Sequence, residues 1–163
     1  FTDPLGEFTG RRETFAAYPE DVRLRKLAIS LGVMAQAGQY NYGRMCKRGD
    51  QAAAWLCVSE FVNAAIEMGY HLNQMYQPFY KWKMRGMDEF HVLTDLKEKL
   101  TRLMQMSGAD SENDGQSSVQ SQIEDICVEV VEELNRQGLT ETKEAFLEIQ
   151  KQEIIRKLQS DAR

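Results

Sequence analysis

Two stretches of the sequence combine cationic, amide and aromatic side chains in a way that could bind a small polar ligand. They read AQAGQYNYGRMCKRGD (35–50) and LNQMYQPFYKWKMRGM (72–87). Lysine and arginine bind phosphate, and aromatic rings stack on a base or a sugar. The alternative is that these groups form solvated faces or are satisfied inside a helical core. The candidate substrate-binding residues are Gln36, Tyr40, Arg44, Asn73, Tyr76, Tyr80 and Lys81.

Pro78 predicts a sharp turn within the second stretch, because a proline pushes the residue before it out of the helical region. At this turn Phe79 and Trp82 are expected to plug the end of a helical bundle. The polar residues around them would then face a ligand or a partner domain.

Two acids lie between these stretches. Glu60 and Glu67 are seven positions apart, so they share one face of a helix. With Asn63 and Gln74 they form a polar stripe close to Asn73, and the alternative is that this stripe is a solvated face.

The sequence lacks the usual marks of a self-contained enzyme. It contains no Gly-rich phosphate loop and no CxxC pair. Its two histidines, His71 and His91, have no partners at metal-ligand spacing, and His71 is expected to be structural. We therefore expect no metal site and no cofactor in this chain.

Hydrophobic residues recur at three- and four-residue steps, which predicts an all-α bundle of about five to seven helices. The first long helix should start at Pro19 and end at Gly49. Asp50 is the expected N-cap of the second helix, which Pro78 should stop near Tyr76.

Further helices are expected beyond Pro78. A third follows it directly, a break falls at 86–88, and a fourth carries the apolar residues from Val92 to Met104. A fifth should run from about Ile123 to Gln137, with Gly138 as its C-terminal stop. The last should begin at an N-cap formed by Thr140.

These elements predict one helical domain over residues 1–163. Within it, 1–18 is a lead-in, 19–106 the main helical core, 107–122 a mobile loop rich in Ser, Gly, Asp and Gln, and 123–163 the C-terminal helices. The chain opens at Phe1 without an initiator Met, and we expect it to be excised from a longer polypeptide.

Charge and cysteine usage limit the location and the partners. The net charge is −5, and residues 107–163 hold 6 Lys/Arg against 13 Asp/Glu, which disfavours general nucleic-acid binding. No apolar run is long enough to cross a membrane. Three scattered cysteines indicate a reducing, cytoplasmic setting.

Three segments, YPEDVRLRKLA (18–28), AQAGQYNYGRMCKRGD (35–50) and LNQMYQPFYKW (72–82), resemble the C-terminal helical domain of a bacterial family of unknown function. In that family a nucleotidyltransferase-like domain comes first. The opening FTDPLGEFT (1–9) and the closing segment 143–158 look like the two edges of that domain, so this resemblance covers nearly the whole chain. More distantly, segments 48–65 and 72–82 are similar to the helical domain of kanamycin-type nucleotidyltransferases and to their HEPN relatives.

The resemblance implies a helical substrate-binding and interface domain that is not catalytic by itself. In the antibiotic-modifying relatives the helical domain supplies part of the acceptor pocket and a carboxylate base, and Glu60 and Glu67 are the weak candidates for that base here. Its metal carboxylates would lie on a Gly-Ser and Asp-x-Asp pattern in the preceding domain, and neither element occurs in this chain. Mg²⁺ and a nucleotide are implied for the parent protein only. The implied partners are that N-terminal nucleotidyltransferase-like domain, a small polar or phosphorylated ligand, and a second copy in a homodimer.

Two alternatives remain open. Arg85 and His91 enclose five residues (RGMDEFH), which fits the Arg-x(4–6)-His motif of HEPN ribonucleases, although Gly86 stands where that motif usually has a polar residue. The chain could also be a structural dimerisation bundle, in which case the polar and aromatic candidates would converge on no cavity.

Overall fold

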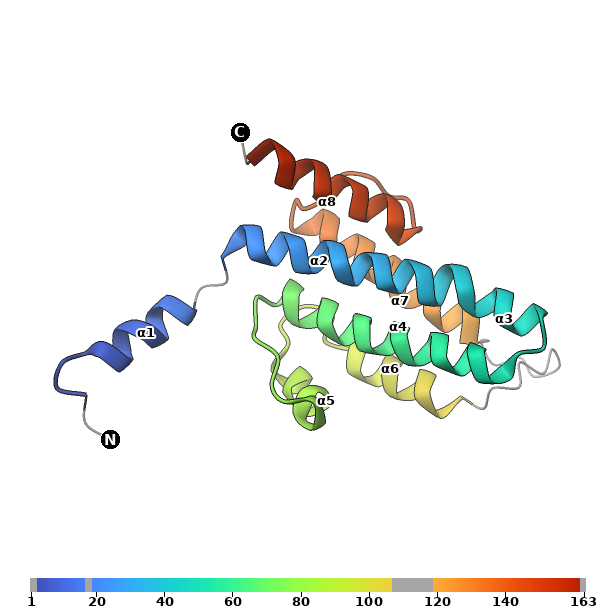
Figure 1. The fold of residues 1–163 in the computed structure, drawn as a ribbon, viewed down its shortest axis with the longest axis horizontal. Coiled ribbons are helices and arrows are strands. Elements are labelled where there is room, and N and C mark those ends of the chain that lie inside the picture. The colour runs from blue at the N-terminus through green and yellow to red at the C-terminus, as the bar shows by residue number, and fades with distance from the viewer. Residues whose placement is uncertain (1–2, 17–18, 107–118, 162–163) are drawn as a thin grey trace.

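The computed structural model describes residues 3–16, 19–106 and 119–161, and every regular element in these ranges is a helix (Figure 1). The helices are α1 (Glu7–Ala16), α2 (Glu20–Met34), the π-helical segment η1 (Ala35–Tyr42), α3 (Gly43–Lys47), α4 (Gln51–Leu72), the 3₁₀ turn η2 (Tyr80–Trp82), α5 (Lys83–Gly86), the 3₁₀ turn η3 (Met87–Glu89), α6 (Leu96–Gln105), α7 (Val119–Arg136) and α8 (Leu147–Asp161). The prediction of an all-α helical bundle is confirmed.

The first long helix runs without interruption through α2, η1 and α3, and it returns antiparallel as α4 (Figure 1). Gly49 ends it with φ +70°, a left-handed conformation that glycine adopts without a steric cost. The Asp50 carboxylate then accepts a hydrogen bond from the Ala53 backbone N–H at 3.0 Å and caps α4. The predicted end of the first helix at Gly49 and the predicted start of the second at Asp50 are both confirmed.

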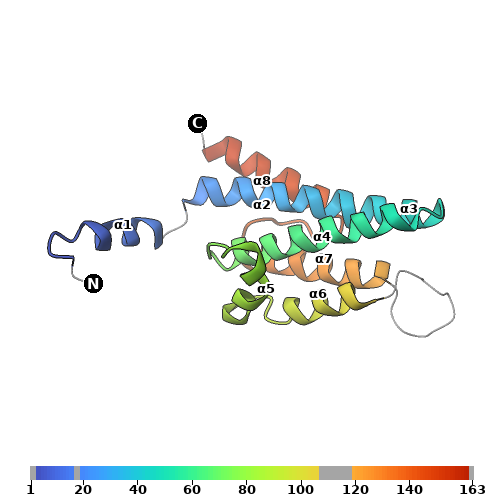
Figure 2. The same cartoon turned by 60° about the horizontal axis from the view of Figure 1, so that its bottom comes forward.

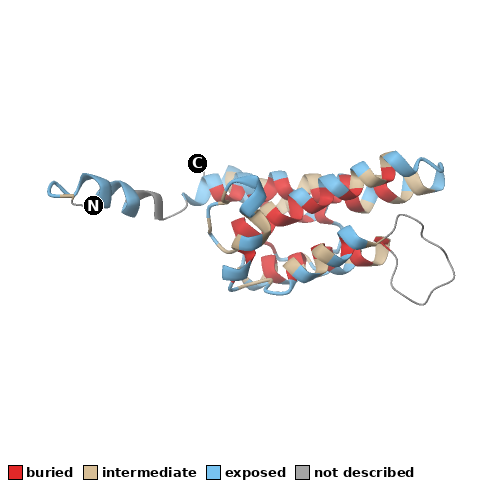
Figure 3. Cartoon of the chain, turned by 90° about the horizontal axis from the view of Figure 1, so that it is seen from below, coloured by how far each residue is buried: buried red, intermediate tan, exposed pale blue. Residues whose placement is uncertain are grey.

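The core lies on the inward faces of these helices, where buried residues alternate with exposed ones at helical spacing (Figure 3). α2 packs between α4 and α8, and α6 packs against α7 (Figure 2). Leu27, Leu31 and Met34 of α2 and Phe61 of α4 are fully buried. Burying such side chains contributes about 1.5–3 kcal/mol each, so this seam is a main source of stability.

The π-helical segment packs closely against α4 and α7. A Cβ atom added at Gly38 would overlap the Phe61 ring of α4 and lie 2.9 Å from Ile123 Cγ2 of α7. The neighbouring Gln39 side chain accepts a hydrogen bond from Leu147 N–H at 2.9 Å and donates one to Glu124 at 2.8 Å. Gln39 therefore ties η1 to the start of α8 and to α7.

Several predicted helix boundaries are wrong. α4 ends at Leu72 and not near Tyr76, because Gln74 adopts a left-handed backbone (φ 55°) four residues before Pro78. The expected break at 86–88 is also displaced, since helical geometry continues to Glu89 and α6 begins only at Leu96.

The C-terminal part holds two more corrections and one confirmation. α7 begins at Val119, within the stretch predicted as a loop, whose residues 107–118 lie outside the described part. α8 begins at Leu147 and not after Thr140. The Thr140 hydroxyl accepts a hydrogen bond from Asn135 Nδ2 at 3.0 Å, and it caps no helix. Gly138 ends α7 as predicted, with φ +66° and Leu139 N–H bonded to Leu134 C=O at 2.9 Å.

Helix α1 stands apart from the bundle at the N-terminal end (Figure 1). Residues 4–13 are exposed, including the apolar side chains of Leu5 and Phe8. The predicted lead-in at 1–18, of which residues 1–2 and 17–18 lie outside the described part, stays a prediction.

Candidate functional site

A pocket of about 470 Å³ opens between α2, α4 and the segment that follows α4. This volume is within the range of small-molecule sites. The residues that line it are Lys26, Ile29, Ser30, Glu67, His71, Tyr76 and Gln77. We call it the Glu67 pocket.

Helical spacing explains why these side chains converge. Lys26 and Ser30 are four residues apart on α2, and Glu67 and His71 are four apart on α4, so each pair shares one face of its helix. Because α2 and α4 pack side by side, the two faces meet at the pocket. Ser30 is almost fully buried, and its hydroxyl has no hydrogen-bond partner among the residues that the structure describes.

Asn73 anchors the segment after α4, whose residues Tyr76 and Gln77 form the third wall of the pocket. Its side-chain oxygen accepts hydrogen bonds from the backbone N–H groups of His91 (2.7 Å) and Val92 (3.1 Å), and its amide donates to Gly69 C=O (2.8 Å) and Val92 C=O (3.1 Å). The chain turns at Gln74 and then brings Tyr76 and Gln77 over the pocket.

Glu67 is the carboxylate at this site. It is half-buried and forms an ion pair with Lys83, whose Nζ lies 3.3 Å from Glu67 Oε1. Lys83 belongs to α5, which is held against α4 because the Tyr70 hydroxyl donates to Lys83 C=O at 2.6 Å. The ion pair fixes the position of the carboxylate beside the pocket.

His71 is buried and uncharged at neutral pH. Burial first, and then the nearby charges of Lys26, Arg23 and Lys83, lower the pKa of His71 from 6.5 to about 4. The backbone C=O of His71 accepts a hydrogen bond from Arg23 Nε at 3.0 Å. The expected structural role agrees with this burial, and the imidazole also lines the pocket.

Arg23 of α2 holds the end of α4 in place next to the pocket. It is buried, and its guanidinium donates to Glu20 Oε1 at 3.1 Å and to the side chain of Gln137, the residue that follows α7. Gln137 in turn donates to the backbone C=O of Leu72 at 3.0 Å. These polar contacts join α2, the end of α4 and the chain that leaves α7.

The structure separates the predicted substrate-binding residues into two groups. Gln36, Tyr40 and Arg44 are exposed on η1 and α3, with the Arg44 guanidinium 4.7 Å from the centre of the Tyr40 ring. This end of the bundle is opposite to the end that carries α5 (Figure 2). These three residues therefore do not line the Glu67 pocket.

The second group of candidates lies at the α5 end with different roles. Tyr76 lines the Glu67 pocket, whereas Tyr80 and Lys81 are exposed on η2. Lys81 Nζ lies 5.3 Å from the centre of the Trp82 ring. Asn73 does not line the Glu67 pocket, because its side-chain amide is bonded to Gly69 and to the backbone of His91 and Val92, and its predicted ligand contact stays a prediction.

The prediction that Phe79 and Trp82 plug the bundle end is also wrong. Phe79 is 66% exposed and Trp82 46% exposed, because the chain is extended before the single turn η2 and carries both rings outward. Phe90 closes the core there, with its ring centre 4.9 Å from that of Tyr70 in an edge-to-face contact.

The remaining catalytic candidates are placed as follows. Glu60 is exposed on α4 and does not line the Glu67 pocket, whereas Glu67 does. Arg85 lies 5.7 Å from the centre of the Trp82 ring and lines a separate shallow groove with Pro78, Gly86, Asp88 and Glu89. His91 is exposed beyond Phe90, and the ribonuclease reading of Arg85 and His91 stays a prediction.

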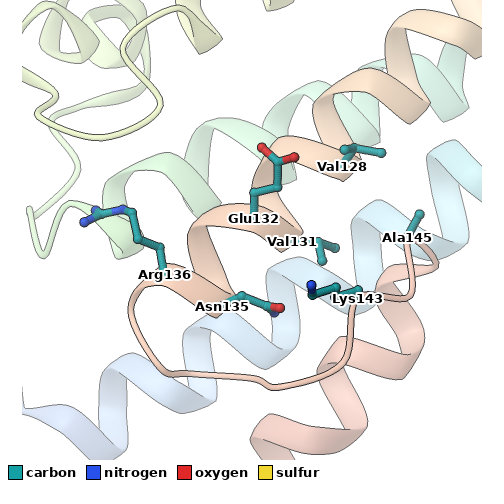
Figure 4. Close-up of a pocket in the computed structure, with 7 residues that line it drawn as sticks. All are labelled: Val128, Val131, Glu132, Asn135, Arg136, Lys143 and Ala145. Atoms are coloured by element: carbon teal, nitrogen blue, oxygen red, sulfur yellow. The ribbon is translucent and has the colours of Figure 1, made fainter.

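A second pocket of about 400 Å³ lies between α7 and the loop that leads to α8 (Figure 4). Val128, Val131 and Ala145 make its surface mostly apolar, and Glu132 and Lys143 stand at its edge. The Glu67 pocket carries more convergent chemistry, because a carboxylate, an imidazole, two hydroxyls and an amine meet there.

Sequence reasoning did not single out Lys26, Ser30 and Gln77. The available signal was the pairing of Lys26 with Ser30 and of Glu67 with His71 at four-residue steps. No group of three or more His, Cys, Asp or Glu side chains within 3–16, 19–106 and 119–161 is arranged to hold a metal ion. No helix in these ranges is long and apolar enough to span a bilayer.

The fold and the site define an all-helical bundle domain with a polar pocket between its first two long helices. The family model described as Domain of unknown function (DUF4037) matches residues 1–83, and the chain belongs to this family. The match includes all the residues that line the Glu67 pocket. No curated protein and no solved structure matches the chain.

Proposed function

We propose that this domain binds the acceptor substrate of a nucleotidyltransferase-like protein and docks on its catalytic domain, without catalytic activity of its own. The observation that carries the proposal is that Glu67 faces a pocket of ligand size together with Lys26, Ser30, His71 and Tyr76. The reaction class comes from the resemblance of segments 18–28, 35–50 and 72–82 to a helical domain that follows a nucleotidyltransferase-like domain, and from the more distant similarity of segments 48–65 and 72–82 to the helical domain of kanamycin-type nucleotidyltransferases.

In this proposal Glu67 is the general base. A hydroxyl of the bound acceptor attacks the α-phosphorus of a nucleoside triphosphate, and pyrophosphate leaves. The hydroxyl proton passes to the Glu67 carboxylate. The N-terminal nucleotidyltransferase-like domain of the parent chain supplies the nucleotide site and Mg²⁺. Lys83, 3.3 Å from Glu67, keeps the carboxylate oriented.

The docking surface is the exposed aromatic group next to the pocket. Phe79 and Tyr80, with ring centres 4.6 Å apart, and Trp82 project from η2 and its approach. Exposed aromatic rings at a surface are typical of protein interfaces. We place the catalytic domain on this surface, in a cytoplasmic protein whose three cysteines are free thiols.

The experiment compares the 163-residue chain with a longer protein that includes the residues encoded ahead of Phe1. Each is incubated with Mg²⁺, labelled nucleoside triphosphates and a mixture of polar metabolites, and nucleotidylated products are detected by mass spectrometry. We expect products with the longer protein and none with the chain alone. Metal-dependent transfer by the chain alone, or a longer protein without a Gly-Ser and Asp-x-Asp pattern, would overturn the proposal.

A further inference from the structure

We propose that the Glu67 pocket binds a small hydroxylated anion, with its phosphate or carboxylate group held by Lys26, Ser30 and Gln77 and a hydroxyl directed to Glu67. The inference deepens the proposed function by assigning the chemical class of the acceptor. Its test is a binding measurement on this chain, which needs no catalytic domain.

The buried hydroxyl of Ser30 is the first indication. Ser30 is 1% exposed and lines the pocket, yet its oxygen has no hydrogen-bond partner among the described residues. Buried polar side chains in folded proteins nearly always have a hydrogen-bond partner, so an unpartnered hydroxyl at a cavity wall points to a partner held in the cavity, an anion or a water. A hydroxyl can donate to an oxyanion.

The sign of the charge around the pocket is the second indication. Lys26 lines the pocket, and Arg23 and Lys83 lie close enough that all three cations act on His71. The carboxylates around these cations are already paired, Glu67 with Lys83, Glu20 with Arg23, and Glu133, which is bonded to Gln137, with Arg136. His71 adds no charge at neutral pH, so the pocket favours an anion.

The donors and the acceptor are arranged for a ligand with two different ends. Lys26 and Ser30 lie one turn apart on α2 and present an ammonium and a hydroxyl, and the Gln77 amide faces them from the third wall. Glu67 stands on α4, across the pocket from α2, and its carboxylate accepts hydrogen bonds from hydroxyl groups.

The same charges exclude a polycationic acceptor. An aminoglycoside carries several ammonium groups, and the Glu67 carboxylate would be its only anionic contact on the pocket wall. The remaining ammonium groups would be repelled by Lys26, which lines the pocket, and by Arg23 and Lys83, which lie close to it. The acceptor therefore differs in charge from kanamycin.

Isothermal titration calorimetry on the chain tests the inference with glucose 6-phosphate, gluconate and kanamycin as probes. The first two compare a phosphate with a carboxylate on a hydroxylated skeleton. We expect saturable binding of at least one of them and none of kanamycin. Lys26→Gln should weaken this binding at least tenfold and Ser30→Ala at least threefold. The matched control Lys47→Gln, which removes the same charge at the opposite end of the bundle, should leave binding unchanged.

Three results would overturn the inference: neither anion binds, an anion binds Lys26→Gln as tightly as the wild type, or kanamycin binds more tightly than both anions. Circular dichroism of each variant confirms that the helices are intact. The outcomes are separable from those of the transfer assay. Transfer to a neutral or cationic acceptor would reject the anionic acceptor and keep the proposed function. Binding of the anion to the chain, with no transfer by the longer protein, would keep the anion site and reject the proposed function.

Discussion

The side-chain oxygen of Asn73 lies 2.7 Å from the backbone nitrogen of His91 and accepts its hydrogen bond. With the further bonds to Gly69 and Val92, this contact joins the end of α4 to the chain that enters α6. The segment between these two points carries Tyr76 over the Glu67 pocket and the aromatic rings into solvent. Asn73 therefore holds the two ends of this segment together, although it does not line the Glu67 pocket itself.

The first prediction concerns this clamp. Asn73→Ala should lower the free energy of unfolding by about 2 kcal/mol, because it leaves the half-buried backbone N–H of Val92 unsatisfied. Urea denaturation followed by circular dichroism measures the change. Asn63→Ala is the matched control, since the Asn63 amide only donates to Ser59 C=O on the exposed face of α4, and its effect should stay within about 0.5 kcal/mol. Equal effects of the two substitutions would contradict the clamp.

The second prediction concerns the close contact at η1. Gly38→Ala should destabilise the fold by about 2 kcal/mol or more, because its Cβ would overlap Phe61 and crowd Ile123. Gly43→Ala is the control in the same continuous helix. Its nearest contact is Gln120 Oε1 at 3.4 Å, so the helix preference for alanine should make it neutral or stabilising by up to about 1 kcal/mol. Thermal unfolding measures both, and a Gly38→Ala variant as stable as Gly43→Ala would refute the packing.

The third prediction concerns pH. His71 has a pKa of about 4 in the folded chain and an ordinary value of 6.5 without these surroundings. Between these values the unfolded state binds a proton that the folded state does not, so stability falls as the pH falls from 6.5 toward 4. The loss from this group is about 3 kcal/mol over the whole window.

Urea denaturation at pH 7.0, 6.0 and 5.0 measures this dependence above the range in which carboxylates titrate. His71→Gln should flatten the dependence between pH 6.5 and 5, whatever its effect on absolute stability. The control His91→Gln removes the exposed histidine, and its stability should depend on pH as that of the wild type does. A wild-type slope that survives in His71→Gln would show that another group is responsible.

The long helices could be predicted because their signals are local. The apolar period of α2 and α4, the left-handed Gly49 and Gly138, and the Asp50 cap each depend on residues within one or two turns. The boundaries that failed depend on distant partners. Asn73 ends its helix against residues 91–92, and the first residue of α8, Leu147, donates its backbone N–H to Gln39 of η1.

The site was only partly predictable for the same reason. Glu67 and Tyr76 were among the candidates, but which of them line a common pocket depends on how α4 packs on α2. That packing adds Lys26 and Ser30, whose sequence context is an ordinary amphipathic helix. It also leaves Gln36, Tyr40 and Arg44 at the opposite end of the bundle, although their sequence stretch looks as suited to a ligand.

The rate of nucleotidyl transfer by the longer protein, compared between Glu67→Gln and Glu60→Gln, tests the central claim most directly. The two acids lie on the same face of α4, but only Glu67 lines the pocket. The account predicts that Glu67→Gln lowers the rate by about 10²–10⁴-fold, as expected for the loss of a general base, and that Glu60→Gln leaves it nearly unchanged. Full activity of Glu67→Gln, or an equal loss in both variants, would contradict it.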